Sequence, residues 1–145
     1  MLIENVDRFE EIPEVYGAFP LKENFLEAGN AALKQYGLQA EVIDNVIHIP
    51  FTDRLLFSED EYDLYGVDDE DNADMKAWRM RMDACISLNG DPDEGIREVW
   101  CEYAVVLPED ENIREFDDCY EPRMNEYDQG YDLIEIFLNK AVDAS

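Results

Sequence analysis

Two segments of alternating apolar residues, joined by Asp44-Asn45, constrain the fold of this chain more than any other feature. If Asp44 and Asn45 form a two-residue turn, the flanking strands pair as a β-hairpin. The predicted pairs are Ile43 with Val46, Val42 with Ile47, and Glu41 with His48. One face of this hairpin is apolar and is predicted to join the core. Its members are Leu38, Ala40, Val42, Ile47, Ile49 and Phe51.

A second alternating segment, from Ile96 to Leu107, predicts one long strand. Its expected core face carries Val99, Cys101, Tyr103, Val105 and Leu107. The opposite face carries Glu98, Trp100 and Glu102. Cys101 is therefore interpreted as a small core residue.

Apolar residues at helical spacing predict three helices, over about residues 20–36, 72–89 and 131–142. The first is expected to end at Gly37 and the second to begin at Asn72. The apolar face of the second helix is expected to carry Met75, Trp78, Met82 and Cys85. The elements together predict an α+β fold, in which a small antiparallel sheet (the hairpin plus one long strand) has about three helices packed on one face.

The 145 residues contain no linker and no repeat of solenoid period, so we expect a single acidic domain over residues 1–145. The first residues lack the basic and apolar regions of a signal peptide, and no apolar run reaches the roughly 18 residues that span a bilayer. Cys85, Cys101 and Cys119 have no Cys-x-x-Cys spacing, which argues against a disulfide framework and against a zinc site. We therefore expect a reduced, cytoplasmic protein that does not bind membranes.

The search for catalytic and metal-binding motifs gives a negative prediction. His48 is the single histidine, and the hairpin register assigns it to an exposed cross-strand pair with Glu41. The segment from Asn89 resembles the start of an EF-hand loop, but Glu94 stands where the turn requires Gly and Trp100 where a bidentate Glu is required. A site built from carboxylates alone has no recognisable spacing and stays open. We expect no enzyme activity, no cofactor and no metal site.

The acidic residues are clustered. The formal net charge is −26, yet 46% of the residues are hydrophobic and 12% aromatic, which is typical of a folded protein rather than a disordered acidic tail. No basic residue lies between Arg54 and Lys76, where nine acids occur. Nine more acids lie within residues 109–128, against only Arg114 and Arg123.

This clustering indicates a function that uses the electric field of the acids, because like charges held side by side destabilise the fold. Duplex DNA carries one charge per about 1.7 Å, and nine acids along an extended sixteen-residue run give one per roughly 6 Å. We expect binding to a basic nucleic-acid-binding protein or protein–nucleic acid complex, and no direct binding to nucleic acid. The predicted contact residues, with three tyrosines as anchors, are Glu59, Asp60, Glu61, Asp63, Asp68, Asp69, Glu70, Asp71, Glu109, Asp110, Glu111, Asp117, Asp118, Tyr62, Tyr65 and Tyr120.

In size, acidity and lack of catalytic motifs the chain resembles the DNA-mimic inhibitors that phages and plasmids use against restriction enzymes, CRISPR effectors and recombination nucleases. The resemblance lies in composition, so it implies a function but no fold and no residue roles. An immunity protein or antitoxin that caps a basic nuclease toxin would be similarly acidic. Adaptation to high salt would also add acids, although it should spread them evenly. An adaptor, a cation-binding protein, an enzyme without recognisable motifs and a homo-oligomer also stay open.

Overall fold

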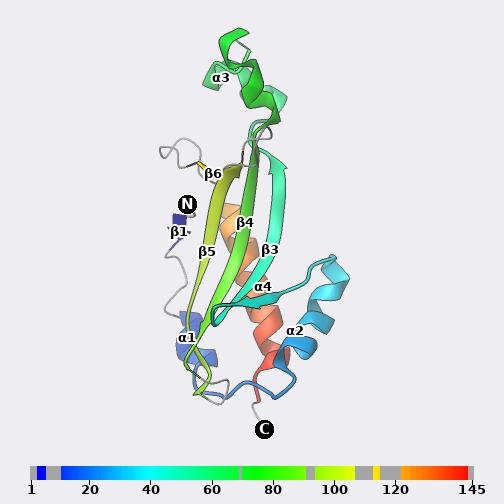
Figure 1. The fold of residues 1–145 in the computed structure, drawn as a ribbon, viewed down its shortest axis with the longest axis vertical. Helices are drawn as coiled ribbons and strands as arrows, with labels where there is room; N and C mark the ends of the chain where they lie inside the picture. The colour runs from blue at the N-terminus through cyan, green and yellow to red at the C-terminus, as the bar shows by residue number, and fades with distance from the viewer. Residues whose placement is uncertain are drawn as a thin grey trace.

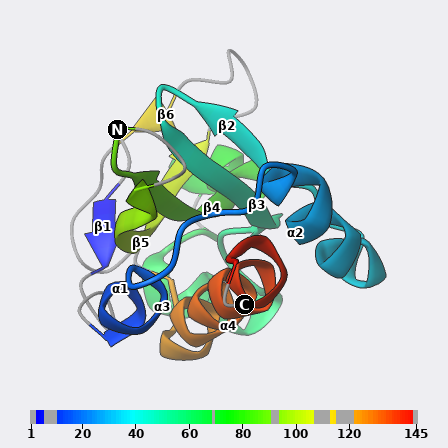
Figure 2. The same cartoon turned by 90° about the horizontal axis from the view of Figure 1, so that it is seen from below.

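The computed structural model of the chain describes residues 3–5, 11–68, 70–90, 94–106, 113–114 and 122–143. It consists of an antiparallel sheet with helices against one of its faces (Figure 1, Figure 2). The predicted α+β fold with a small antiparallel sheet is therefore confirmed. None of the helices in the described ranges is long and apolar enough to cross a membrane.

Every pair of neighbouring strands in the sheet is antiparallel, and the order is β1-β5-β4-β3-β2, with β6 also paired to β5. The strands are β1 (Ile3–Asn5), β2 (Glu41–Ile43), β3 (Val46–Leu55), β4 (Arg79–Leu88), β5 (Ile96–Val106) and β6 (Ile113–Arg114). The long strands β3, β4 and β5 form the centre of the sheet and carry most of its core residues.

Helix α4 lies against the centre of the sheet, with α1 and α2 to either side of it (Figure 2). The α-helices are α1 (Glu11–Tyr16), α2 (Phe25–Leu33), α3 (Tyr62–Tyr65) and α4 (Met124–Ala141). The described residues also form the 3-10 helices η1 (Lys34–Tyr36), η2 (Glu59–Glu61) and η3 (Glu70–Ala77). Gly29 lets α2 approach α4 closely, because a Cβ atom at this position would overlap the ring of Phe137.

The hairpin forms in the predicted register. The paired residues are Ile43 with Val46, Val42 with Ile47, and Glu41 with His48. Asp44 and Asn45 have φ angles of 50° and 67°, the positive values that a two-residue hairpin turn requires. Ile47 and Ile49 are fully buried, but the prediction that Val42 joins the core is wrong, since it is 39% exposed. β2 is the edge strand and lies away from α4, so nothing in the helical layer covers it (Figure 2).

The predicted helix over residues 72–89 is wrong for most of its length. Residues 70–77 form η3, and Arg79–Leu88 forms strand β4. The core-facing residues of this strand alternate, as Met80, Met82, Ala84, Ile86 and Leu88, while Cys85 is buried on the opposite face. A period of two is a strand signal, and pairing with β3 on one side and β5 on the other stabilises it. Met82 and Cys85, assigned to one helix face, therefore lie on opposite faces of the sheet.

The other two predicted helices exist with different bounds. The first begins at Phe25 rather than at residue 20, and η1 continues it to Gly37, whose φ of 71° ends it as predicted. The C-terminal helix begins at Met124, earlier than the predicted residue 131, and presents its predicted apolar face inward. The buried residues of that face include Ile134, Phe137, Leu138 and Ala141.

The predicted long strand is confirmed as β5. Its core-facing residues are Val99, Cys101, Tyr103 and Val105, all of them buried. Leu107 lies outside the described residues. Cys85 and Cys101 are both buried, and Cys119 falls outside the described residues.

Candidate partner-binding surface

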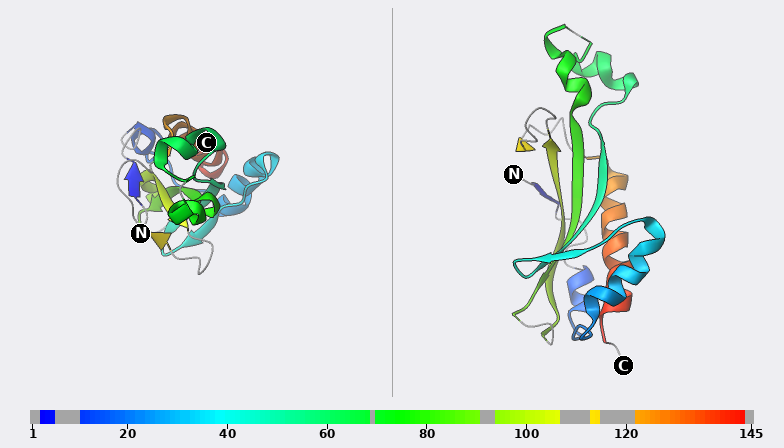
Figure 3. Two further views of the ribbon diagram at one scale, coloured as in Figure 1. Left: turned by 90° about the horizontal axis from the view of Figure 1, so that it is seen from above. Right: turned by 45° about the vertical axis from the view of Figure 1, so that its right-hand side comes forward.

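Residues 56–78, which connect β3 to β4, form a projection beyond the end of the sheet (Figure 1, Figure 3). The projection contains η2, α3 and η3, and α1 and α2 lie at the opposite end of the molecule. It carries the first acidic cluster of the sequence. The contacts that hold the projection together therefore determine where those acids lie relative to the sheet.

The projection has a small apolar interior. Its buried residues are Leu56, Phe57, Val67, Met75 and Trp78. The backbone N–H of Leu56 donates to the carbonyl oxygen of Trp78 at 2.8 Å, which holds the two ends of the projection together. The N–H of Val67 donates to the carbonyl oxygen of Tyr62 at 2.8 Å and closes α3. The segment is therefore a folded unit rather than an extended loop.

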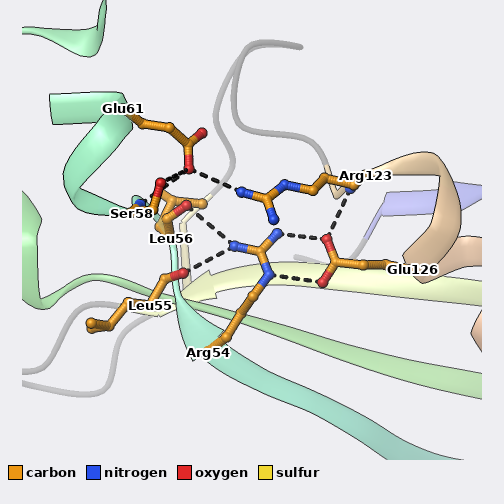
Figure 4. Close-up of polar contacts among 7 residues, drawn as sticks. All are labelled: Arg54, Leu55, Leu56, Ser58, Glu61, Arg123 and Glu126. Carbon is orange, nitrogen blue, oxygen red and sulfur yellow. Dashed lines mark hydrogen bonds and ion pairs between the residues drawn. The ribbon is translucent and has the colours of Figure 1, made fainter. Parts of the chain in front are cut away.

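An ion-pair network joins the base of the projection to α4 (Figure 4). Arg54 donates from Nε to Oε2 of Glu126 at 2.8 Å and from Nη2 to Oε1 at 2.6 Å. The same guanidinium donates to the backbone oxygens of Leu55 and Leu56 at 2.9 and 3.2 Å. Such a bidentate pair fixes orientation as well as distance. The direction in which the chain leaves β3 is thereby set relative to α4.

Glu61 adds a second connection at the base (Figure 4). Its Oε1 accepts hydrogen bonds from the Ser58 backbone N–H at 3.1 Å, from the Ser58 hydroxyl at 2.9 Å and from Arg123 at 3.0 Å. The N–H of Arg123 donates to Glu126 at 2.9 Å, so the two carboxylates share one network. Burial raises the pKa of Glu61, but the hydrogen bonds from Ser58 and the charge of Arg123 outweigh this and hold it below its ordinary value.

The outer surface of the projection is acidic. Its exposed acids are Glu59, Asp60, Asp63, Asp68, Glu70 and Asp74. Lys76 is the single basic residue in the segment, and it is engaged internally. Its Nζ lies 3.4 Å from Oδ1 of Asp68 and 5.0 Å from the ring centroid of Tyr62. Leu64, in α3 among these acids, is 77% exposed.

The predicted contact residues of the first acidic cluster differ in exposure: some are exposed, some are half-buried, and some have side chains outside the described residues. Those exposed on the projection are Glu59, Asp60, Asp63, Asp68 and Glu70. Glu61 and Tyr62 are half-buried, the first in the base network and the second packed against the core. Tyr65 and Asp71 lie in α3 and η3, but their side chains, like Asp69, fall outside the described residues.

The predicted contact residues of the second cluster all lie outside the described residues. They are Glu109, Asp110, Glu111, Asp117, Asp118 and Tyr120. Between them in the sequence, Ile113 and Arg114 form β6 and pair with Val106 and Val105 at the end of β5. Val106 pairs in turn with Arg79, where the chain returns from the projection. β6 therefore lies at the same end of the sheet as the projection.

The base network was missed by the sequence analysis. Arg54 and Glu126 are 72 residues apart, so no local spacing connects them. Only Ser58 and Glu61 gave a local signal, because Ser-x-x-Glu is the spacing of a helix-capping box. The exposed side chain of Leu64 was likewise absent from the predicted contact set.

No family model, curated protein or solved structure matches this chain. The chemistry of the projection is therefore the starting point for a functional argument. On the described part of the projection, exposed carboxylates and the exposed side chain of Leu64 lie on one folded segment, and such a surface produces a strongly negative local field.

Proposed function

We propose that this protein is a DNA-mimic inhibitor that binds the basic nucleic-acid-binding surface of a host defence complex and blocks it. The target class is a restriction enzyme, a CRISPR effector or a recombination nuclease, acting in the cytoplasm. The observation that supports this proposal is the projection, which carries six exposed acids on a segment fixed at its base. The proposal includes neither catalysis nor contact with nucleic acid.

The position of these charges matters as much as their number. Acids on a projection can enter a concave basic cleft, whereas acids spread over the flat face of a sheet cannot. Because Arg54 and Glu126 already fix the base, binding does not have to order the segment first. Long-range attraction raises association rates by about 10- to 1000-fold, and salt weakens it.

Leu64 supplies a contact of a different kind. Exposed charge pairs contribute about 0–1 kcal/mol each, whereas full burial of a leucine side chain contributes about 1.5–3 kcal/mol. With 77% of its surface exposed, Leu64 is available for such burial. A contact of this type retains affinity at salt concentrations that release nucleic acid from the same basic surface.

The test compares two variants that each lose four negative charges. The projection variant carries E59Q, D60N, D63N and E70Q. The control variant carries E11Q, E14Q, E23Q and E27Q, at exposed positions in or beside α1 and α2. Binding is measured by surface plasmon resonance to an immobilised restriction enzyme, a CRISPR effector complex and a recombination nuclease, with duplex DNA as competitor. We expect the association rate of the projection variant to fall about tenfold or more, and that of the control variant to fall much less.

Three outcomes would change the proposal. Equal losses in both variants would mean that net charge acts without regard to the projection. Unchanged binding in both would move recognition elsewhere, for example to the sheet face around Trp100. Binding to one nuclease toxin, with no effect on the three defence enzymes, would favour an immunity protein or antitoxin instead.

A further inference from the structure

The face of the sheet opposite α4, which faces the viewer in Figure 1, brings together polar side chains from three adjacent strands. His48 of β3 pairs with Cys85 of β4. Two residues along β4, Asp83 pairs with Glu102 of β5. Alternate residues of a strand share a face, so all four side chains lie on this one face.

The side-chain atoms of this group are close together. Nδ1 of His48 lies 3.4 Å from Sγ of Cys85 and 3.6 Å from Oδ2 of Asp83. One ligand atom each from His48, Cys85 and Glu102 form a group within 4.8 Å of one another. His48 is thus more than the exposed partner of Glu41 that the hairpin register predicted, because it turns toward the neighbouring strand.

The residues of this cluster differ in their exposure to solvent. Cys85 is fully buried, whereas the side chains of His48 and Asp83 are 21% and 29% exposed. Among the described residues, neither Asp83 nor Glu102 forms an ion pair with a lysine or arginine. The thiol, the imidazole and the carboxylate of Glu102 therefore lie close together, with Asp83 beside His48, and neither carboxylate is neutralised by a lysine or arginine among the described residues.

A nucleophilic cysteine–histidine pair is a poor explanation of this arrangement. Burial, together with the charges of Glu102 and Asp83, raises the pKa of the Cys85 thiol far above its ordinary value. A reactive cysteine needs the opposite environment, electropositive and partly exposed. A bound metal ion, by contrast, deprotonates a coordinating thiol outright.

We propose that His48, Cys85 and Glu102 bind one borderline-soft divalent transition-metal ion, Zn²⁺ being the best match, with Asp83 beside His48 at the edge of the site. Zinc takes nitrogen, sulfur and oxygen donors at about 2.0–2.3 Å, which places tetrahedral ligands about 3.3–3.8 Å apart. The 3.4 Å separation between Nδ1 of His48 and Sγ of Cys85 has this spacing, and a carboxylate oxygen of Glu102 lies within 4.8 Å of both atoms. Calcium and magnesium prefer oxygen ligands throughout, so this donor set disfavours them.

Trp100 supports one of the ligands. Its Nε1 donates a hydrogen bond to Oε1 of Glu102 at 2.6 Å, which leaves the other carboxylate oxygen for the ion. Hydrogen bonds of this kind orient metal ligands, and their loss typically weakens metal binding about 10- to 100-fold. Because the indole touches a ligand directly, its fluorescence provides a local readout of metal binding.

The first experiment uses the unmodified protein. Zn²⁺ is titrated by calorimetry with millimolar Mg²⁺ present, so that the exposed acids are already occupied by weakly held cations. We expect one tight site per chain. Co²⁺ is then added as a spectroscopic probe, and we expect a thiolate-to-cobalt charge-transfer band in the near ultraviolet. A spectrum without that band would overturn the proposal, since Cys85 would not be a ligand.

The second experiment compares the two buried cysteines. C85A should abolish the cobalt band and weaken zinc binding by more than the about 10- to 100-fold expected from losing a supporting hydrogen bond. C101A, on the opposite face of the same sheet, should leave both unchanged. H48Q should weaken zinc binding as C85A does, while any cobalt that still binds keeps the thiolate band, and W100F should lower zinc affinity about tenfold. Equal zinc affinity in C85A and C101A would refute the site.

The projection variant should keep its zinc site, so this proposal and the proposed function fail independently.

Discussion

The two ends of the molecule are built on different principles. The body buries a continuous apolar face of the sheet under α1, α2 and α4, and residues such as Ile134 and Phe137 are completely inaccessible. The projection has a much smaller interior, in which Val67 alone among the described residues is fully buried, and its base depends on ion pairs. The mutually repelling acids are thus held on a segment with few fully buried residues, although its apolar side chains are continuous with the core of the body.

This difference implies different stabilities. Within the described elements, α3 packs mainly on η2, and the projection makes few contacts with the helical layer. Segments with few buried apolar contacts open at lower free energy than the core of the same protein. We therefore expect the projection to open locally while the sheet and α4 stay folded.

The largest effect is predicted for Phe137→Ala. This ring is fully buried and packs against Gly29 of α2. Its removal should lower the free energy of unfolding by about 3–5 kcal/mol, through lost burial and the cavity left behind. Denaturant unfolding followed by circular dichroism would measure this loss.

The matched change in the projection is Val67→Ala, which removes two buried methyl groups and about 1–2 kcal/mol of local burial. Hydrogen exchange should accelerate in residues 56–78, while the denaturant midpoint of the sheet barely moves. If Val67→Ala instead lowers the global free energy of unfolding by the full amount of about 1–2 kcal/mol expected from the lost burial, the projection and the body unfold as one unit.

An intermediate effect is predicted for Glu126→Gln, which breaks the connection between the two regions. Removing one partner leaves Arg54 half-buried without its counter-charge, and we expect a loss of about 1–3 kcal/mol, between the values for exposed and buried pairs. D128N, an exposed acid on the same helix, is the control and should change stability by less than about 0.5 kcal/mol.

The pH dependence of this effect has a definite sign. Burial raises the pKa of Glu126, but the hydrogen bonds and charges of Arg54 and Arg123 outweigh it and hold the pKa below its ordinary value of 4.5. A lowered folded pKa contributes stability above the unfolded pKa and loses it as the pH falls through the folded value. The stability difference between wild type and E126Q should be constant near neutral pH and shrink below about pH 4.5. A difference that persists unchanged at low pH would mean that packing, and not ionisation, stabilises this contact.

The sequence predicted the elements whose signals are local. The hairpin register followed from Asp44-Asn45 alone and is correct throughout. β4 was mistaken for a helix, although the alternation from Met80 to Leu88 was visible, because its stabilising partners are two distant strands. The predicted C-terminal helix omitted the first turns of α4, which contain Gly130, a residue that is intrinsically unfavourable in a helix interior. The structure requires this glycine, since a Cβ atom there would meet the Sγ of Cys101.

The functional surfaces were predictable only in part. The nine acids of the projection all lie within residues 59–74, so their clustering is a property of the sequence itself. The network that fixes them joins Arg54 to Glu126 across 72 residues, and the cluster of His48, Cys85 and Glu102 comes from three strands. A ligand set assembled by strand pairing has no characteristic spacing, and the search for Cys-x-x-Cys and EF-hand patterns could not detect it.

The smallest effect is predicted for the projection variant itself, measured as stability rather than binding. Its four substitutions, E59Q, D60N, D63N and E70Q, relieve repulsion among exposed groups, so at low ionic strength stability should rise by a few tenths of a kcal/mol. Hydrogen exchange should slow within residues 56–78 and stay unchanged in α4, because the relief is local. At about 1 M salt the Debye length falls to about 3 Å and the gain should disappear. A loss of stability instead would mean that these acids make contacts that hold the projection together, and that their clustering serves the fold before it serves a partner.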